Sequence, residues 1–208
     1  MANWYFDVIS PFSWLALPEV EALGQEVAYR PVLLGALLKH WGQLGPAEIP
    51  PKRILTYRLC VWLAAERGIP FRMPPVHPFN PLRAMRLLAA VGPDARTVRA
   101  AMETIWAEGT DVGESAGFGK LATRLQAADP DGLIAATGAK DTLRACTDDA
   151  AARGVFGVPT LELGGELFWG LDAMPLARAV LADSGLLARG EMGRLATLGQ
   201  AQRSRAPA

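Results

Sequence analysis

Two hydroxyl-bearing residues flank a proline and an aromatic residue near the start of the chain, as Ser10-Pro11-Phe12-Ser13. They follow an apolar run at residues 4–9 and precede residues with helical spacing. Serine is a favoured helix N-cap and proline suits the first helical position, so one interpretation is purely structural. The other is that Ser10 presents its hydroxyl at a helix N-terminus, where backbone N–H groups and the helix dipole stabilise an anion.

The composition favours small-molecule chemistry over binding to nucleic acid or to a membrane. The chain has 208 residues, half of them hydrophobic, and 21 basic residues balance 21 acidic ones. Its length predicts one domain, with room for a large insertion, and its zero net charge argues against a general partner for nucleic acid or anionic lipid. No basic leader and no apolar run of about 18 residues occurs, so we expect a cytoplasmic protein.

The cysteines and histidines do not suggest a metal site or a redox site. Cys60 and Cys146 are far apart and no C-x-x-C occurs, so each is expected to be a small buried hydrophobe. His40 and His77 alone cannot build a His-rich metal site, and the phosphate-binding pattern G-x-x-x-x-G-K-[ST] is missing. We therefore expect neither a metal nor a nucleotide.

Hydrophobic periodicity predicts a β-α-β start, a long helical segment and a final hairpin with a helix. The start comprises a strand at residues 4–9, a helix at 14–23 and a strand at 27–34, whose proline indicates a sheet edge or strand end. The helical segment is predicted to contain helices at residues 35–42, 53–67, 81–90, 94–106, 115–126, 130–137 and 140–153. Residues 157–170 predict two short strands around Gly164-Gly165, followed by a helix at 174–184.

This order is typical of an α/β, thioredoxin-like fold with a large all-helical domain inserted after the first β-α-β unit. We predict a thioredoxin-like domain formed by residues 1–35 and 154–188, an inserted helical domain at 36–153, and a mobile polar tail at 189–208. In this arrangement the loop after the first strand and the loop before the hairpin can lie side by side.

Four segments resemble one enzyme family. FDVISPFSWLA at residues 6–16, GPAEIPPKR, HPFNPLRAMRL and GVFGVPTLELGGELFWGLDAM at residues 154–174 are similar to segments of the 2-hydroxychromene-2-carboxylate isomerases. These enzymes are relatives of the kappa-class glutathione transferases and of DsbA-type thiol oxidoreductases. Ser10-Pro11-Phe12-Ser13 occupies the place of the oxidoreductases' Cys-x-x-Cys. Because disulfide exchange needs a thiolate that no hydroxyl replaces, we do not expect oxidoreductase activity.

The resemblance implies glutathione as the cofactor. Ser10 would donate a hydrogen bond to the glutathione thiolate, since a free thiol with a pKa of about 8.5 is only slightly ionised at neutral pH. Val158 and Pro159, joined by a cis peptide in this superfamily, would bind the tripeptide as a strand does. The γ-glutamyl end would lie against Trp169, Gly170, Leu171 and Asp172. Asp172 would meet its ammonium group, although an aspartate at this place can also cap the last helix.

The resemblance further implies a small aromatic carboxylate as the substrate. Lys52 and Arg53 are candidates for its carboxylate, with Arg better suited to a bidentate contact. The remaining pocket positions would be Phe12, Trp41 and Asn80. Family members often carry a tyrosine three residues after the lysine, whereas this chain has Leu55 there and a tyrosine at Tyr57. The identity of the substrate therefore stays open.

The implied activity interconverts 2-hydroxychromene-2-carboxylate and trans-o-hydroxybenzylidenepyruvate in naphthalene-type catabolism. The glutathione thiolate would add reversibly to a conjugated carbon, the bond thereby made single would rotate, and expulsion of the thiol would regenerate glutathione. One alternative is a kappa-type transferase, in which the thiolate attacks an electrophile and stays attached. Another is a non-catalytic protein that binds glutathione or a peptide beside the proline. A homodimer is one option for the oligomeric state.

Overall fold

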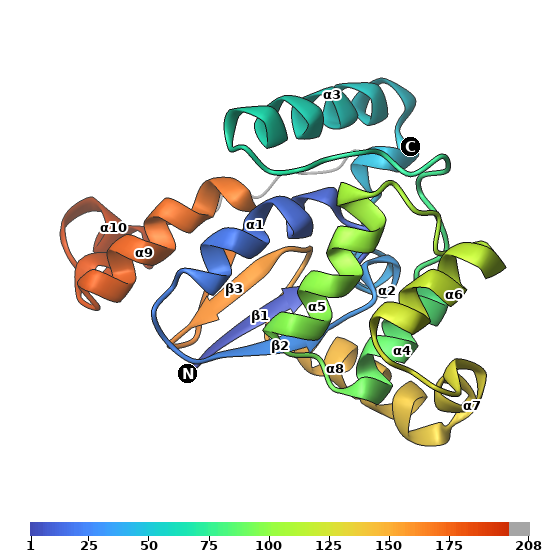
Figure 1. Cartoon of the computed structure of the whole chain (residues 1–208). Helices are drawn as coiled ribbons and strands as arrows, with labels where there is room; N and C mark the ends of the chain where they lie inside the picture. The colour runs from blue at the N-terminus through green and yellow to red at the C-terminus, as the bar shows by residue number, and fades with distance from the viewer. Residues whose placement is uncertain (200–208) are drawn as a thin grey trace, which may run out of the picture.

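The computed structural model describes residues 1–199, which form a four-stranded mixed sheet with helices on both faces (Figure 1). Its strands, in the spatial order β2-β1-β3-β4, are β2 (Val27–Pro31), β1 (Ala2–Phe6), β3 (Thr160–Leu163) and β4 (Glu166–Trp169). β1 runs parallel to β2 and antiparallel to β3, and β3 and β4 form the expected hairpin. Gly164 and Gly165 both have positive φ angles, as a tight turn at this dipeptide requires.

The predicted helices are all present, within a few residues of their expected ends. α1 (Pro11–Glu21) follows β1, and α9 (Met174–Ala182) follows β4. Between β2 and β3 lie α2 (Leu34–His40), α3 (Pro50–Glu66), α4 (Leu82–Val91), α5 (Ala95–Met102), α6 (Ser115–Arg124), α7 (Pro130–Ala135) and α8 (Thr137–Ala152). The fold with a helical insertion between β2 and β3 is therefore confirmed.

Four departures from the expected elements occur. The strand expected at 4–9 is β1, Ala2–Phe6, and the strand expected at 27–34 ends at Pro31. The helix expected at 94–106 changes after α5 into a π-helical turn, Glu103–Ala107. The expected polar tail begins with a short helix, α10 (Gly190–Leu195), and its last residues, 200–208, lie outside the described part of the chain. Among the described helices, none has the length and apolar content that crossing a membrane requires.

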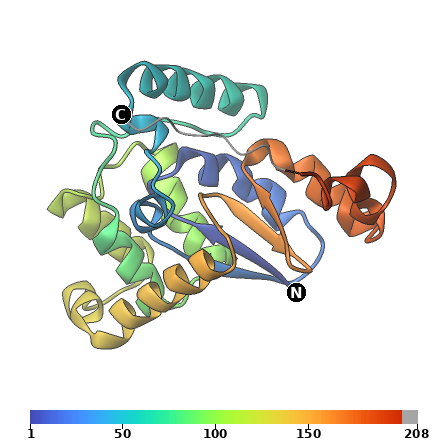
Figure 2. The same ribbon diagram turned by 180° about the vertical axis from the view of Figure 1, so that it is seen from behind.

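The alternation of side chains along β1 divides the core between the two faces of the sheet. Trp4 and Phe6 stack with ring centroids 5.1 Å apart and pack with the buried residues of α1, α4 and α5, whereas Tyr5 packs with buried residues of α2 and α8. Figures 1 and 2, which view the molecule from opposite sides, show α1 and α5 over one face and α8 over the other. The insertion thus shares its cores with the sheet.

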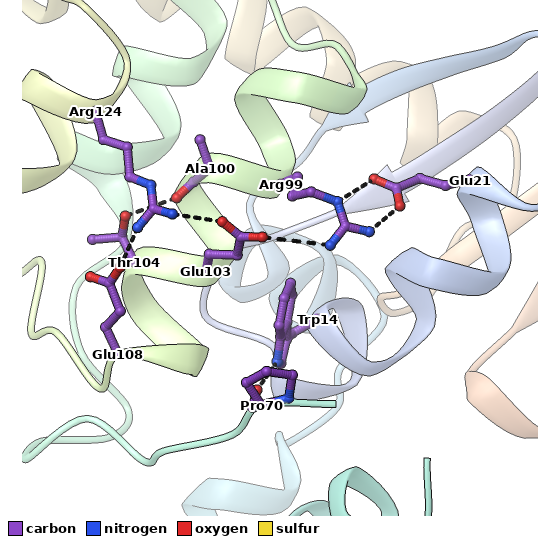
Figure 3. A network of polar contacts seen from close by, with 9 residues as sticks. All are labelled: Trp14, Glu21, Pro70, Arg99, Ala100, Glu103, Thr104, Glu108 and Arg124. Atoms are coloured by element: carbon purple, nitrogen blue, oxygen red, sulfur yellow. Dashed lines mark hydrogen bonds and ion pairs between the residues drawn. The ribbon is translucent and has the colours of Figure 1, made fainter. Parts of the chain in front are cut away.

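A chain of ion pairs joins the helices that cover the α1 face (Figure 3). Arg99 on α5 pairs with Glu21 at the end of α1 and lies 3.6 Å from Glu103 in the π-helical turn. Arg124 on α6 lies 2.6 Å from Glu103 and also pairs with Glu108. These charges alternate in sign, so the network links α5 to both α1 and α6. Because the pairs are partly exposed, each contributes little to the stability of the fold.

The π-helical turn brings Trp106 under the backbone that precedes Ser10. The indole Nε1 donates to the Val8 carbonyl oxygen over 2.9 Å, and the ring stacks on Phe71 with centroids 5.7 Å apart. Both Val8 and Trp106 are fully buried, so water cannot replace this donor. A residue of the insertion therefore holds the loop between β1 and α1.

We predict that Trp106→Phe lowers the free energy of unfolding by about 1–3 kcal/mol through the unsatisfied Val8 carbonyl, before any loss of packing. Denaturant unfolding followed by circular dichroism measures this change. Trp169→Phe is the matched control, because Trp169 is half-exposed and substitutions at such positions usually change stability by less than about 0.5 kcal/mol. Equal effects of the two substitutions would contradict the assigned role of the Val8 contact.

Candidate functional site

Ser10 is the N-cap of α1, as its position predicted. Its Oγ accepts a hydrogen bond from the backbone N–H of Ser13 at 3.3 Å, and Pro11 occupies the first helical position. The Oγ also lies 3.5 Å from the Val158 carbonyl oxygen, longer than an ordinary O–H···O bond. Since this bond is weak, the proton can turn towards another acceptor at little cost, while the cap bond stays in place.

The loop before the hairpin lies directly against Ser10. The Val158-Pro159 peptide is cis, as the resemblance implied, and both residues are buried. Gly170, which follows β4, donates its backbone N–H to the Pro159 carbonyl oxygen at 2.8 Å. The structure therefore brings together the start of α1, the cis proline and the end of the hairpin, three segments far apart in the sequence.

Ser13 adds a second hydroxyl to the first turn of α1. Its Oγ is buried and has no hydrogen-bond partner among the described residues, which is rare for a buried polar atom. The first turn of α1 therefore holds two buried hydroxyls at the positive end of the helix dipole. Phe12, between the two serines, is half-buried.

Asp7 fixes the turn that leads into Ser10. Its carboxylate oxygens accept the backbone N–H of Ile9 at 3.1 Å and of Leu34 at 2.9 Å, and the Ser10 N–H donates to the Asp7 carbonyl oxygen. Burial raises the pKa of Asp7 to about 6, although backbone N–H donors from Leu34, Ile9 and Val8 lower it. Asp7 thus joins the site loop to the start of α2.

His77 holds the same turn from the loop after α3. Its Nε2 lies 2.9 Å from the Ile9 carbonyl oxygen, and since a carbonyl only accepts, this nitrogen carries the proton. The Tyr57 hydroxyl on α3 lies 2.7 Å from Nδ1 and 2.9 Å from the His77 carbonyl oxygen. Burial lowers the pKa of His77, although its bond to Ile9 raises it, so the ring is neutral at pH 7.

The predicted carboxylate-binding residues lie on different sides of α3. Arg53 is one turn before Tyr57, and its charge lowers the pKa of the Tyr57 hydroxyl, which burial raises more strongly. Arg53 is exposed, as Lys52 is, and it shares with Tyr57 the side of α3 that reaches His77. Lys52 is exposed and shares a side of the helix with Leu55 and Leu59, away from Tyr57.

Two further pocket candidates have identified partners. The Trp41 indole Nε1 donates to the Val155 carbonyl oxygen at 3.0 Å, so the half-exposed ring lies beside the loop that carries the cis proline. Asn80 is exposed, and its Oδ1 accepts the backbone N–H of Leu82 at the start of α4. The structure therefore brings Trp41 to the site loop and gives Asn80 a structural contact.

The segment after the hairpin corrects one expectation. Asp172 lies in a 3-10 turn, Leu171–Ala173, and the N-cap of α9 is Ala173, without a side-chain hydrogen bond. The prediction that Asp172 caps α9 is therefore wrong, because the 3-10 turn separates Asp172 from that helix. Its carboxylate is exposed beside Gly170, where a Cβ would come 2.7 Å from Oδ1.

The indole of Trp169, at the end of β4, lies against the loop that precedes the cis proline. The half-exposed Trp169 packs on Phe156 with ring centroids 5.1 Å apart, and a Cβ at Gly157 would come 2.7 Å from its Nε1. Leu171 is buried beneath the turn. This part of the site combines an aromatic wall with an exposed carboxylate.

Comparisons with known proteins agree with this geometry. The model of a DSBA-like thioredoxin domain matches residues 2–182. The chain belongs to this family. A 2-hydroxychromene-2-carboxylate isomerase of Sphingobium xenophagum is 29% identical over 192 residues, covering 87% of this chain and 97% of that protein. A glutathione S-transferase kappa 1 of Caenorhabditis elegans is 26% identical over 147 residues, covering 64% of this chain and 65% of that protein.

The fold of this DSBA-like domain is also that of a solved isomerase. A structure of a 2-hydroxychromene-2-carboxylate isomerase superposes with a TM-score of 0.79 at 23% sequence identity, and covers 94% of this chain and 97% of its own. The DsbA-like thioredoxin fold expected from the order of the elements is confirmed. Relatives with these two enzyme names indicate that the chain is an enzyme.

Neither protein thiol is placed for chemistry in this DSBA-like domain. Burial raises the pKa of Cys60, on the inner side of α3, to about 12. Burial also raises the pKa of Cys146 on α8, with the Asp149 charge adding to it and Arg30 opposing it. In the described part of the chain, no three His, Cys, Asp or Glu side chains are grouped as metal ligands.

Three residues that hold the site were not predicted from the sequence. They are Asp7, which begins the four-residue turn that ends at Ser10, and His77 and Trp106, which contact that turn. A signal existed for Asp7, because it is a single charged residue within an apolar run, where a buried carboxylate needs several donors. No comparable local signal marks Trp106, whose partner is 98 residues away.

We predict that the stability of the wild-type protein relative to Asp7→Asn falls as the pH rises from about 4 to 6. Because the pKa of Asp7 is raised by folding, the folded state binds more protons than the unfolded state in this range. The protonated Asp7 stabilises the folded state fully below the ordinary aspartate pKa, and this contribution is lost above pH 6. The free energy of unfolding is expected to change by up to about 3 kcal/mol between these two limits. Urea unfolding of both proteins across this range measures it.

Asp94→Asn is the control for the sign of this effect. Hydrogen bonds from Thr97 lower the pKa of Asp94, so this carboxyl stabilises the fold above its ordinary pKa and loses that contribution as the pH falls. Parallel pH profiles for wild-type and Asp7→Asn would show that Asp7 does not titrate in this way.

Proposed function

We propose that the protein is a glutathione-dependent isomerase that interconverts 2-hydroxychromene-2-carboxylate and trans-o-hydroxybenzylidenepyruvate in naphthalene-type catabolism. One observation carries the proposal. A buried serine hydroxyl, at the start of α1 and 3.5 Å from the carbonyl oxygen of Val158, occupies the place where a disulfide oxidoreductase has a thiol. The named relatives, of which several are isomerases of this type, support it.

The residues present suit glutathione. The tripeptide needs an anion-stabilising place for its sulfur, strand-like backbone contacts and a carboxylate for its ammonium group. Ser10 and the Ser13 hydroxyl, which has no partner among the described residues, are suited to the sulfur. The backbone of Val158 is suited to the strand-like contacts, and the exposed Asp172 is suited to the ammonium group. When bound there, glutathione supplies the thiolate nucleophile that no cysteine of this chain provides.

Ser10 acts by holding its proton towards negative charge. Its Oγ is fixed by the Ser13 N–H, so the O–H can turn from Val158 without moving the oxygen. A donor held in place before the reaction needs no reorganisation when charge develops, and it favours the ionised form of a nearby thiol. The hydroxyl and the helix terminus together therefore raise the reactive fraction at neutral pH.

The aromatic carboxylate would bind between α3 and the site loop. Arg53 lies on the side of α3 that also carries Tyr57, and its planar guanidinium suits a carboxylate. Trp41, beside the loop of the cis proline, and the half-buried Phe12 offer apolar faces. That Lys52 and Asn80 contribute to this pocket stays a prediction. The cytoplasmic location of the protein also stays a prediction.

A kappa-type glutathione transferase is the second candidate. The similarity to glutathione S-transferase kappa 1 of two species favours it, and both activities need the same activated thiol. A non-catalytic protein that binds glutathione or a peptide would need no hydroxyl at position 10. The fate of the thiol separates these three functions.

We predict that Ser10→Ala lowers turnover of 2-hydroxychromene-2-carboxylate about 10²- to 10³-fold, as expected for one donor to a developing charge. A spectrophotometric assay with glutathione measures this loss, and circular dichroism checks the fold. Cys60→Ala and Cys146→Ala serve as controls and leave turnover nearly unchanged. Normal turnover in Ser10→Ala removes this residue from its role, and inactivation by a cysteine change in a folded protein indicates a protein-thiol mechanism.

We also predict that turnover requires glutathione and does not consume it. The reason is that the activated sulfur belongs to glutathione and leaves unchanged, since both protein thiols are protonated at neutral pH. Substrate absorbance and free thiol are followed together in dialysed enzyme with added glutathione. Undiminished isomerisation without glutathione contradicts the proposal, whereas loss of thiol in step with product identifies the transferase.

A further inference from the structure

A buried glutamate in β3 has no part in the proposed reaction. Glu162 is only 8% exposed, yet three side chains reach its carboxylate. Its Oε2 accepts the Tyr5 hydroxyl at 2.8 Å and the Asn3 amide at 3.0 Å, both from β1. Its Oε1 lies 3.2 Å from Nη1 of Arg153. A buried carboxylate is costly unless such donors surround it, so this set of contacts fixes Glu162 in one place.

The two donors from β1 cannot exchange their roles. Arg30 Nε donates to the Asn3 Oδ1 at 3.0 Å, so the Asn3 amide nitrogen faces Glu162. Burial and the neighbouring Glu162 raise the pKa of Tyr5, so its hydroxyl stays protonated and donates at neutral pH. Glu162 is thus tied firmly to β1 through two hydrogen bonds.

Arg153 ties Glu162 to the end of α8. It is the C-cap of that helix, and its Nε also donates to Asp149, one turn earlier, at 2.8 Å. Arg153 and Glu162 are nine residues apart, on either side of residues 154–159, which carry the cis proline. We call these six residues the cis-proline loop. The contact joins the two ends of this loop, and closing a loop reduces the conformations available to it.

Within the cis-proline loop, the peptide groups on both sides of Val158 are already bound. The carbonyl oxygens of Gly157 and Pro159 accept hydrogen bonds at 2.7 and 2.8 Å. The N–H of Val158 has no acceptor among residues 1–199, and its carbonyl oxygen has only the 3.5 Å contact with Ser10. A buried N–H without a partner is rare. The loop therefore holds the Val158 backbone ready for a ligand, at a position that its two ends determine.

We propose that Glu162 is a positioning residue, which through Arg153 sets the place of Val158 opposite Ser10 and thereby the affinity for glutathione. The inference rests on the proposed function, in which the Val158 backbone binds the tripeptide as a strand does. Such hydrogen bonds need donor–acceptor distances of about 2.7–3.2 Å, so a small displacement of the loop weakens them. None of the hydrogen bonds of Glu162 in the described chain reaches Ser10 or Val158, so it acts through the loop.

Isothermal titration calorimetry with glutathione is the first test. Glu162→Gln keeps the size of the side chain but loses the charge that meets Arg153, and we expect it to raise the dissociation constant about tenfold. Arg153→Gln removes the same contact from its exposed partner and is expected to act similarly. Glu166→Gln, at an exposed position of the same hairpin, is the matched control and is expected to leave the dissociation constant unchanged.

A double-mutant cycle separates this contact from general damage to the fold. The double variant Glu162→Gln, Arg153→Gln is expected to bind glutathione about as weakly as either single variant, because both changes remove one contact. The KM for glutathione is expected to rise, whereas turnover at saturating glutathione stays close to wild type because the Ser10 cap is unchanged. Effects that multiply in the double variant, or an equal effect of Glu166→Gln, overturn the inference.

Hydrogen exchange tests the position of the loop without any ligand. In Glu162→Gln, the backbone amides of residues 154–158 are expected to exchange faster than in Glu166→Gln, since the loop opens more often. Unchanged exchange in this segment overturns the positioning role, even where binding weakens. Failure of the wild-type protein to bind glutathione overturns the proposed function, and the exchange rates still decide whether Glu162 holds the loop.

Discussion

Every backbone group of the turn from Asp7 to Ser10 needs a partner, because the turn is almost entirely shut off from water. Within the turn, Asp7 accepts the N–H groups of Ile9 and Ser10, and the other groups need partners from elsewhere. The Val8 carbonyl is bound by Trp106, the Val8 N–H faces the Met85 sulfur at 3.4 Å, and the Ile9 carbonyl is bound by His77. The helical insertion therefore stabilises the site directly, since it provides each of these side chains.

Local rules were sufficient for the parts of the structure that depend on neighbouring residues. They predicted the order of the elements, the cap at Ser10, an edge or end position for Pro31 and the turn at Gly164-Gly165, because each follows from the conformational preference of one or two residues. They placed the start of α3 at residue 53, whereas the helix includes both preceding prolines, which fit a first helical turn.

Side chains whose partners lie far away in the sequence were beyond these rules. His77 contacts Ile9 across 68 residues, and Trp106 reaches Val8 only because a π-helical turn rotates the end of its helix. Hydrophobic periodicity assigns Trp106 to the core and cannot assign its N–H to one carbonyl. The cap at Asp172 failed for a local reason, since α9 begins at Met174 as predicted and its N-cap is Ala173, the last residue of the 3-10 turn.

α3 is connected to the site through bonds that the structure shows. The Tyr57 hydroxyl on its inner side lies 2.7 Å from Nδ1 of His77, and Nε2 of His77 lies 2.9 Å from the Ile9 carbonyl oxygen in the turn before Ser10. Arg53 stands one turn before Tyr57 on the same helix, so a displacement of α3 would move the proposed carboxylate contact and the support of the Ser10 turn together.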